Sequence, residues 1–375
     1  MKIHIVTGAF PPDINPRSFR SAELARQFAR NGHKVTVTNL SYTPNYDYKN
    51  LEKEIGITID NIPIYYHTKA KHEIKKSRFE KIKSSLRAIG RYYLGGKLFF
   101  YEREIIKKIN IPKDTDVVIS ISVPFVTHYS VSKYRKKRER IFNKSCFIAD
   151  SGDPFSTCQQ FKMAFYFKAF ERRVYKQFDY LAIPTSAARE AYLDLIPQDK
   201  IKVIPQGFDF QIRNSLPLYV KNDIPTFAYA GVFYKGIRNP DFLFRYLSEL
   251  NRPFNFYLFL REKDLFIESI LDKYSSTLKG KVYTYYGILR EELLRKLATM
   301  DFLINIGNTT SVQVPSKIID YALVNRPFIS FTEKTFKSSV FENFMNGNFS
   351  EAEIVPYLDR YDIKNVSEQF LSLVK

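Results

Sequence analysis

Lys317 and Asp320 are the pair of side chains whose types and spacing most directly indicate chemistry. Pro315 stands two residues before Lys317, and proline is favoured in the first turn of a helix. A helix N-terminus presents unpaired N–H groups and partial positive charge, so it suits a phosphate. Residues three apart share a helix face, which would place the cation beside the carboxylate, as a nucleotide-sugar site requires. A capped surface helix with an ordinary ion pair has the same spacing, and the residues alone leave both interpretations open.

The sequence around this pair resembles a known donor-site motif. Residues 315–321 read Pro-Ser-Lys-Ile-Ile-Asp-Tyr, which is similar to the P-S-K-x-x-E-Y variant found in the family 4 retaining glycosyltransferases. Asp320 stands where that family usually has glutamate, and the first acid of the commoner motif would fall at Val312, which cannot act as one. The resemblance implies that Asp320 holds the donor's ribose. It further implies donor contacts from Ser311, Pro315, Ser316 and Lys317.

Two further segments of the C-terminal half resemble the same family. Residues 226–231 read as a strand that ends in Gly231, and the loop that follows contains Lys235 and Arg238. A glycine at a strand end followed by a cationic loop suits a diphosphate, although the spacing does not decide between the two cations, and solvated cations are the alternative. Leu289 lies just before a predicted helix, where the family holds the nucleotide base through backbone groups.

The N-terminal half begins with a strand, a loop, a helix and a second strand. The strands are expected at 2–7 and 33–38 and the helix from about Ser18 to Asn31, the opening of a doubly wound α/β domain. The same order resembles the N-terminal signature of these glycosyltransferases, which usually have Gly-Gly where this chain has Asn15-Pro16. The resemblance implies acceptor contacts from this loop region, at Asn15 and Arg20.

Two other strand ends of the N-terminal half carry candidate acceptor residues. Residues 150–155 read Asp-Ser-Gly-Asp-Pro-Phe and resemble the family's D-x-R-D-P-W segment, with Gly152 in the place of arginine. We expect Asp153 either to orient the acceptor hydroxyl or to fix the loop. His128 follows another strand and is either an acceptor contact or a packing histidine. The resemblance, together with the position of the His128 loop at the same sheet edge, indicates a catalytic set of Asp153, His128, Lys317 and Arg238.

The domain boundary is expected near residue 207. Residues 203–209 read Val-Ile-Pro-Gln-Gly-Phe-Asp and are similar to the V-I-P-N-G-x-D segment that closes the first domain of these proteins. The resemblance implies an α/β fold of the GT-B type, with two Rossmann-like doubly wound domains that face a central cleft. Residues 1–207 would bind the acceptor and 208–360 the donor, and a C-terminal helix at about 361–375 would cross back to the N-terminal domain. Residues 342–349 are expected to be irregular.

Composition agrees with two folded domains and indicates an acidic partner. The chain has 375 residues, 45% of them hydrophobic, which is enough for two cores. Its two cysteines show neither a disulfide framework nor metal spacing, which fits a reducing cytosol. The net charge is +19, and residues 1–200 hold 36 Lys and Arg against 20 Asp and Glu, whereas 201–375 hold 22 against 19. Such an excess in one half predicts nucleic acid or an anionic membrane surface as partner.

Residues 69–108 are the most basic stretch, with 13 Lys and Arg against 4 Glu. Aromatic and aliphatic residues interleave with these charges. The stretch could be a pair of amphipathic helices on an anionic membrane, a stacking surface for nucleic acid, or ordinary helices with lysine-rich solvated faces. No nucleic-acid-binding module is recognisable, so we favour the membrane surface and expect no nucleic acid partner.

The resemblance implies transfer of a sugar from a nucleotide-sugar, UDP- or GDP-linked, to an acceptor hydroxyl with retention and without a metal or other cofactor. The basic N-terminal half favours a lipid-linked glycan acceptor of bacterial surface polysaccharide synthesis. We therefore expect a cytoplasmic protein peripherally associated with the inner face of the cell membrane. Two alternatives stay open: a sugar-nucleotide epimerase of the same fold, and a non-catalytic partner protein, the latter because of Val312 and the altered loop at Asn15-Pro16.

Overall fold

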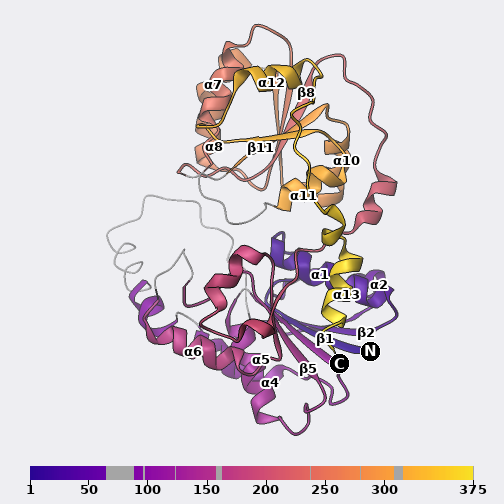
Figure 1. The fold of residues 1–375 in the computed structure, drawn as a ribbon, viewed down its shortest axis with the longest axis vertical. Helices are drawn as coiled ribbons and strands as arrows, with labels where there is room; N and C mark the ends of the chain where they lie inside the picture. The colour runs from indigo at the N-terminus through magenta and orange to yellow at the C-terminus, as the bar shows by residue number, and fades with distance from the viewer. Residues whose placement is uncertain are drawn as a thin grey trace. The chain divides into compact units, whose positions relative to one another are not determined.

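In the computed structural model the chain forms two α/β units (Figure 1). The N-terminal unit comprises Met1–Asp209 with Arg360–Lys375, and the C-terminal unit comprises Phe210–Asp359. The division falls two residues after the predicted boundary. The structure describes residues 1–64, 88–95, 98–122, 124–157, 163–236, 238–278, 280–307 and 316–374, with only the backbone of 98–100 and Ser316. Ser311, Val312 and Pro315 therefore lie outside the described residues.

The N-terminal unit is built on a sheet of seven described parallel strands in the order β3-β2-β1-β4-β5-β6-β7. Long apolar runs such as β1 and β4 suit central parallel strands, which are covered on both faces. The chain leaves β1 toward β2 on one side and returns to β4 on the other, so the strand order reverses between β1 and β4, where α/β proteins place ligands. The strands are β1 (Lys2–Thr7), β2 (Lys34–Asn39), β3 (Thr58–Asn61), β4 (Val117–Ile121), β5 (Cys146–Asp150), β6 (Tyr180–Ile183) and β7 (Ile201–Val203).

Two helical layers cover this sheet (Figure 1). Alternate residues of each strand point to opposite faces, so Val117 and Ile119 of β4 pack with one layer and Val118 with the other. The first layer contains α1 (Pro16–Arg30), α2 (Tyr48–Ile55) and α13 (Ile363–Leu371). The second contains α4 (Leu98–Lys108), α5 (Val126–Lys137) and α6 (Tyr166–Tyr175).

The C-terminal unit repeats this plan with five described parallel strands in the order β10-β9-β8-β11-β12. Its core is aromatic: the ring of Phe227 stacks between Phe256 and Phe302, at centroid distances of 4.7 and 4.9 Å. The strands are β8 (Thr226–Gly231), β9 (Asn255–Leu260), β10 (Val282–Tyr286), β11 (Phe302–Ile306) and β12 (Phe328–Phe331). One face packs against α7 (Asp241–Glu249), α8 (Leu265–Lys273), α9 (Ser275–Leu278) and α12 (Ser338–Met345), and the other against α10 (Arg290–Ala298) and α11 (Ser316–Leu323).

Four elements differ from their predicted limits, and the smallest difference is in β2, which begins and ends one residue later than expected. Helix α1 begins at Pro16, because the Asn15 side chain accepts from the backbone N–H groups of Arg17 and Ser18 at 3.0 and 2.9 Å and so caps the helix. The expectation of an irregular segment at 342–349 is wrong over its first half, since α12 runs to Met345 with its apolar face in the core. Helix α13 is shorter than predicted, and its Ile363, Val366 and Phe370 are buried in the N-terminal unit.

Candidate functional site

The site in the C-terminal unit lies where β8 and β11 separate. Strands β9 and β10 continue the sheet on one side of β8, and β11 and β12 continue it on the other, so the strand order places the expected ligand position at the carboxyl ends of β8 and β11. Tyr321 of α11 bridges these ends: its hydroxyl accepts from the Ala230 N–H at 2.9 Å and donates to the Ile304 carbonyl at 3.0 Å. The fully buried Tyr321 therefore fixes α11 at these strand ends.

Gly231 ends β8 and lets the following loop turn at the strand end. Its φ of +142° disfavours any side chain, and an added Cβ would lie 3.2 Å from the Tyr229 hydroxyl. The Val232 carbonyl accepts from the Tyr229 hydroxyl at 3.0 Å and from Arg238 Nη1 at 3.1 Å. Backbone hydrogen bonds between Tyr234 and Arg238 close the loop. The bond from Arg238 Nη1 to the Val232 carbonyl holds the guanidinium on the inner side of the loop.

Lys235, the second cation of this loop, projects into solvent from the turn. Arg238 lies near enough to Lys317 for its charge to lower the pKa of that lysine. The geometry thus separates the two cations that the sequence could not distinguish: Arg238 lies at the predicted donor site and Lys235 at the surface.

Lys317 is a buried cation. Its residue is 9% exposed, and Nζ lies 4.3 Å from the centroid of the Tyr229 ring. Among the residues that the structure describes, no acceptor lies within hydrogen-bond distance of Nζ. Burial, with a smaller contribution from the charge of Arg238, holds the pKa of Lys317 well below its usual range. A buried ammonium without a counter-charge is costly, and a bound anion would remove that cost.

Asp320 lies one helical turn after Lys317 and is paired with an arginine that the sequence did not point out. Arg290 Nη2 and Nε donate to Asp320 Oδ1 at 2.7 and 3.2 Å. Arg290 is the first residue of α10 and directly follows Leu289, which is exposed. The pair therefore connects the predicted ribose contact to the predicted base loop. In the sequence, Arg290 could have been noticed because it directly follows this predicted loop.

Asp150 is the buried acid at the carboxyl edge of the N-terminal sheet. The Arg20 Nε donates to its Oδ2, and Arg17 Nη1 lies 3.6 Å from its Oδ1. Arg20 also donates to the carbonyls of Pro205 and Ile204 at 2.5 and 3.0 Å, so it joins the end of β5 to the segment after β7. Arg20 was predicted as an acceptor contact, but the structure places it in the interior. Its guanidinium donates hydrogen bonds to a buried carboxylate and to two backbone carbonyls.

The cation that does reach solvent at this edge is Arg17, which sequence reasoning missed. Its side chain is 18% exposed. A Cβ placed on Gly152 would overlap Arg17 Nη2, so the glycine makes room for the guanidinium. The signal was the glycine itself, which stands where the resembled motif has arginine. Asn15, the other predicted loop contact, has its side-chain oxygen engaged as the cap of α1.

His128 is packed in the core of the N-terminal unit. It is fully buried, its Nδ1 lies 2.8 Å from Ser120 Oγ, and its ring contacts Phe125, Tyr175 and Phe178. Burial lowers the pKa of His128 to about 3, so the ring is neutral at physiological pH. This environment favours the packing interpretation over acceptor contact, because an acceptor would have to enter the core to reach the ring.

Asp153 is exposed at the same edge. The loop around it is held by Glu171, whose carboxylate accepts from the backbone N–H groups of Phe155 and Ser156, both at 2.8 Å. Burial raises the pKa of Glu171, while these hydrogen bonds oppose the rise. Because Glu171 fixes the loop, the Asp153 carboxylate is not needed for that purpose.

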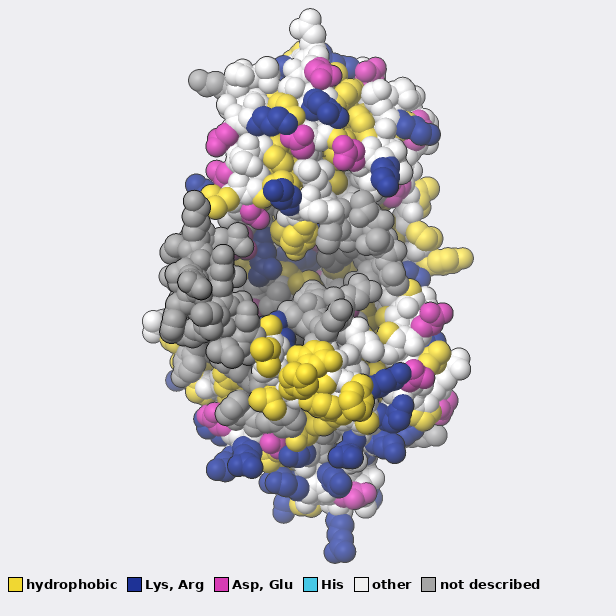
Figure 2. Space-filling model, turned by 90° about the vertical axis from the view of Figure 1, so that its left-hand side faces the viewer, with side chains coloured by type: hydrophobic (Ala, Val, Ile, Leu, Met, Phe, Trp, Pro, Cys, Tyr) yellow, Lys and Arg dark blue, Asp and Glu magenta, His cyan; other side chains and the backbone are white. Residues whose placement is uncertain are grey.

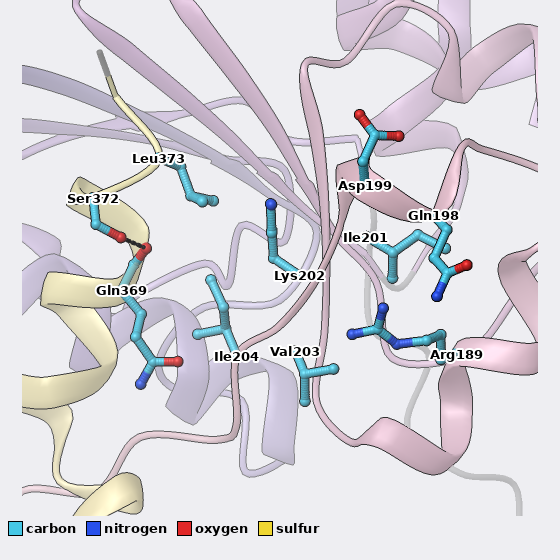
Figure 3. Close-up of a pocket in the computed structure, with 10 residues that line it drawn as sticks. All are labelled: Arg189, Gln198, Asp199, Ile201, Lys202, Val203, Ile204, Gln369, Ser372 and Leu373. Atoms are coloured by element: carbon cyan, nitrogen blue, oxygen red, sulfur yellow. Dashed lines mark hydrogen bonds between the residues drawn. The ribbon is translucent and has the colours of Figure 1, made fainter.

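A hollow lies away from all of these residues, beside the edge strand β7. It has a volume of about 800 Å³, and Figure 3 shows Lys202 of β7 between Gln369 of α13 and Arg189 of the preceding segment. Its lining in the described part of the chain includes none of the predicted site residues. In the described ranges, no three His, Cys, Asp or Glu side chains cluster as metal ligands would, and no helix is long and apolar enough to cross a bilayer.

The two Rossmann-like units define the GT-B fold, as predicted, and solved structures share it. A glycosyltransferase from Rickettsia africae matches with a TM-score of 0.59 and 12% identity over 100% of this chain and 94% of its own. Anabaena Alr3699/HepE in complex with UDP-glucose gives 0.59 and 10% over 99% and 98%. The UDP-GlcNAc 2-epimerase of Methanocaldococcus jannaschii gives 0.53 and 13% over 100% and 99%. No family model and no curated protein matches the sequence. Identities this low establish the fold alone.

Proposed function

We propose that the protein is a retaining glycosyltransferase that moves a sugar from a nucleotide-sugar to an acceptor hydroxyl. The observation that carries this proposal is Lys317, a buried ammonium with no acceptor among the described residues, beside Arg238 at the carboxyl ends of β8 and β11. A diphosphate is the ligand whose charge two adjacent cations and a glycine turn suit.

The proposed donor site combines this placement with the contacts that the resemblance implies. Lys317 and Arg238 bind the diphosphate, and the backbone at Gly231 approaches it closely. Asp320, oriented by Arg290, accepts from the ribose, and the backbone around Leu289 holds the base of a UDP- or GDP-linked sugar. The resemblance also supports donor contacts from Ser311, Pro315 and Ser316.

In the proposed reaction the bond between the anomeric carbon and the diphosphate oxygen breaks, and the acceptor oxygen bonds to that carbon from the same face. The acceptor's proton passes to the departing diphosphate. Lys317 and Arg238 stabilise the negative charge that develops on the leaving group, and we propose that no metal or other cofactor takes part. Asp153 orients the acceptor hydroxyl in the N-terminal unit.

We further propose that the acceptor is a lipid-linked glycan of surface polysaccharide synthesis, met at the inner face of the cell membrane. The charge of the N-terminal half supports this, since residues 1–200 carry 36 Lys and Arg against 20 Asp and Glu. An anionic leaflet attracts such a surface and raises the local concentration of protein near its acceptor.

The test is the shift in melting temperature produced by UDP, GDP, ADP and CMP and their sugars on wild type, Lys317→Met and Asp320→Ala. One nucleoside diphosphate should stabilise the wild type. Lys317→Met should lose about 10- to 100-fold in affinity, as expected for lost hydrogen bonds to a charged group. Lys334→Met, an exposed lysine of the same unit, is the matched control and should behave as wild type. Absence of any nucleotide shift in wild type would favour a non-catalytic partner protein. A shift that survives in Asp320→Ala would remove the ribose assignment.

The second candidate is a sugar-nucleotide epimerase, because the fold is shared with a UDP-GlcNAc 2-epimerase. Incubating the protein with the stabilising nucleotide-sugar alone, and following the sugar by NMR, separates the two. A glycosyltransferase leaves the donor's configuration unchanged without acceptor, whereas an epimerase converts it to an isomer.

A further inference from the structure

Large hydrophobic side chains are exposed where helical residues 88–94 lie against the start of α6. Phe165 is 91% exposed, Leu94 61% and Tyr93 56%. Ile89, Tyr92 and Tyr166 are exposed as well, and we call these six residues the aromatic patch. Figure 2 shows hydrophobic side chains gathered on this side of the N-terminal unit. Soluble surfaces rarely leave so many large apolar side chains together, which marks the patch as an interaction surface.

The two segments of the patch are joined through the backbone and leave their side chains outside. The Ala164 N–H donates to the Tyr92 carbonyl at 3.1 Å, and the Tyr166 hydroxyl donates to the Tyr93 carbonyl. From 88 to 94 every residue is exposed except Gly90, which is half-buried. This helix therefore keeps its apolar side chains in water when the protein is free, and a partner that covers them would stabilise it.

The surroundings of the patch are cationic. On α6, Phe167, Phe170 and Val174 face the core, whereas Arg172 and Arg173 lie outside, beyond the aromatic end of the helix. Helices α4, α5 and α6 together hold ten Lys and Arg against three Glu, and α5 contains no acid. Figure 2 shows the lysines and arginines of this side gathered below the hydrophobic side chains. The surface thus combines an apolar centre with a basic margin.

We infer that the aromatic patch docks the protein on an anionic lipid bilayer. Tyrosine rings suit the headgroup level, where one end is wet and the other apolar, and Leu94, Ile89 and Phe165 reach the acyl boundary. Lysine and arginine meet lipid phosphates, whereas lysine is depleted from protein–protein interfaces. The inference deepens the proposed function, on which it rests for the lipid-linked acceptor. It also extends the membrane surface predicted at 69–108 to Phe165 and Tyr166, far along the chain.

The test is flotation of the full-length protein with vesicles of phosphatidylcholine alone or mixed with phosphatidylglycerol. Wild type should float with the anionic vesicles and be released in part by salt, which screens the basic margin. The triple variant Tyr93→Ser, Leu94→Ser, Phe165→Ser should partition about tenfold more weakly or worse, because three apolar anchors are lost. Leu218→Ser, Val220→Ser, Ile354→Ser is the matched control, since these exposed residues lie in the C-terminal unit. This control should float like wild type.

Three outcomes would overturn the inference. The first is that wild type does not float with anionic vesicles, and the second is that the patch variant floats as well as wild type. The third is that wild type stays in solution with vesicles but forms a concentration-dependent dimer that the patch variant does not form. The last would assign the patch to a second copy of the chain. The nucleotide shift of the same samples keeps the two proposals separate. Flotation without a nucleotide shift contradicts only the proposed function, and a nucleotide shift without flotation contradicts only the docking surface.

Discussion

The carboxyl edges of the two sheets carry similar residue types in opposite states of pairing. In the N-terminal unit, buried Asp150 is ion-paired with Arg20 through Oδ2, and its Oδ1, which accepts no hydrogen bond in the described part of the chain, lies 3.6 Å from Arg17 Nη1; Glu171 accepts from two backbone N–H groups. In the C-terminal unit, Lys317 is buried with no acceptor in the described part of the chain and with a second cation, Arg238, as neighbour.

This difference distinguishes buried charges that stabilise the fold from a buried charge that can bind a ligand. A buried charge whose partners are all supplied by the chain can hold strands and loops in place, because pairing offsets its loss of hydration. A buried charge without a partner lowers stability unless a ligand supplies one, so its retention points to binding. Asp320 lies between these cases. It is ion-paired with Arg290, but its side chain is still partly exposed to solvent.

The largest expected effect is on the paired edge. Arg20→Ala leaves Asp150 without its closest partner and should reduce the free energy of unfolding by about 3–5 kcal/mol, the usual cost of breaking a buried ion pair. Urea denaturation measures this. Lys108→Ala, which removes an exposed pair with Glu104, is the control and should cost less than about 1 kcal/mol. Equal losses in the two variants would mean that Arg20 is not a structural residue.

A smaller effect is expected for Gly152, which lies beside the partly exposed Arg17 at the carboxyl edge of the N-terminal sheet. Gly152→Ala would displace the flexible end of Arg17 rather than the backbone. Stability should fall by less than in Arg20→Ala, because Arg17 is the more distant of the two arginines at Asp150. Sugar transfer to the acceptor should fall about tenfold or more through misplacement, while the nucleotide shift stays unchanged. Arg17→Met should reproduce the loss in a transfer assay; full activity in that variant would attribute the effect of Gly152→Ala to the loop instead.

The last prediction is a gradual trend with pH rather than a single loss, and it tests whether Lys317 is unpaired. Because burial lowers the folded-state pKa of Lys317 below the ordinary value of 10.5, the unfolded chain binds more protons between these two values. Wild-type stability should consequently rise with pH in this window relative to Lys317→Met, by less than about 1.4 kcal/mol per pH unit. Urea denaturation of both proteins from about pH 7 to about pH 10 measures the trend. A difference that is constant with pH, or one that grows in favour of Lys317→Met, would contradict an unpaired buried ammonium.

Local patterns predicted much of the fold. The strand, loop, helix and strand at the N-terminus predicted the opening of a doubly wound unit, because these signals depend on neighbouring residues. The second unit and the division near residue 207 were implied by the resemblance of local motifs such as residues 203–209. Where such signals were misjudged, the cause was also local. Asn15-Pro16 is a cap followed by a first-turn proline, so α1 begins two residues before the predicted start.

The pairing of charges was decided only by the tertiary structure. Nothing near Asp320 in the sequence indicates Arg290, 30 residues away, and nothing near Arg20 indicates Asp150, 130 residues away. The order of the strands brings each pair together, buries His128 and turns Arg238 rather than Lys235 toward Lys317. The sequence by itself determined which residue types stand at the strand ends. Which of them are paired, buried or left for a ligand depends on contacts between distant segments, and these exist only once the sheets have formed.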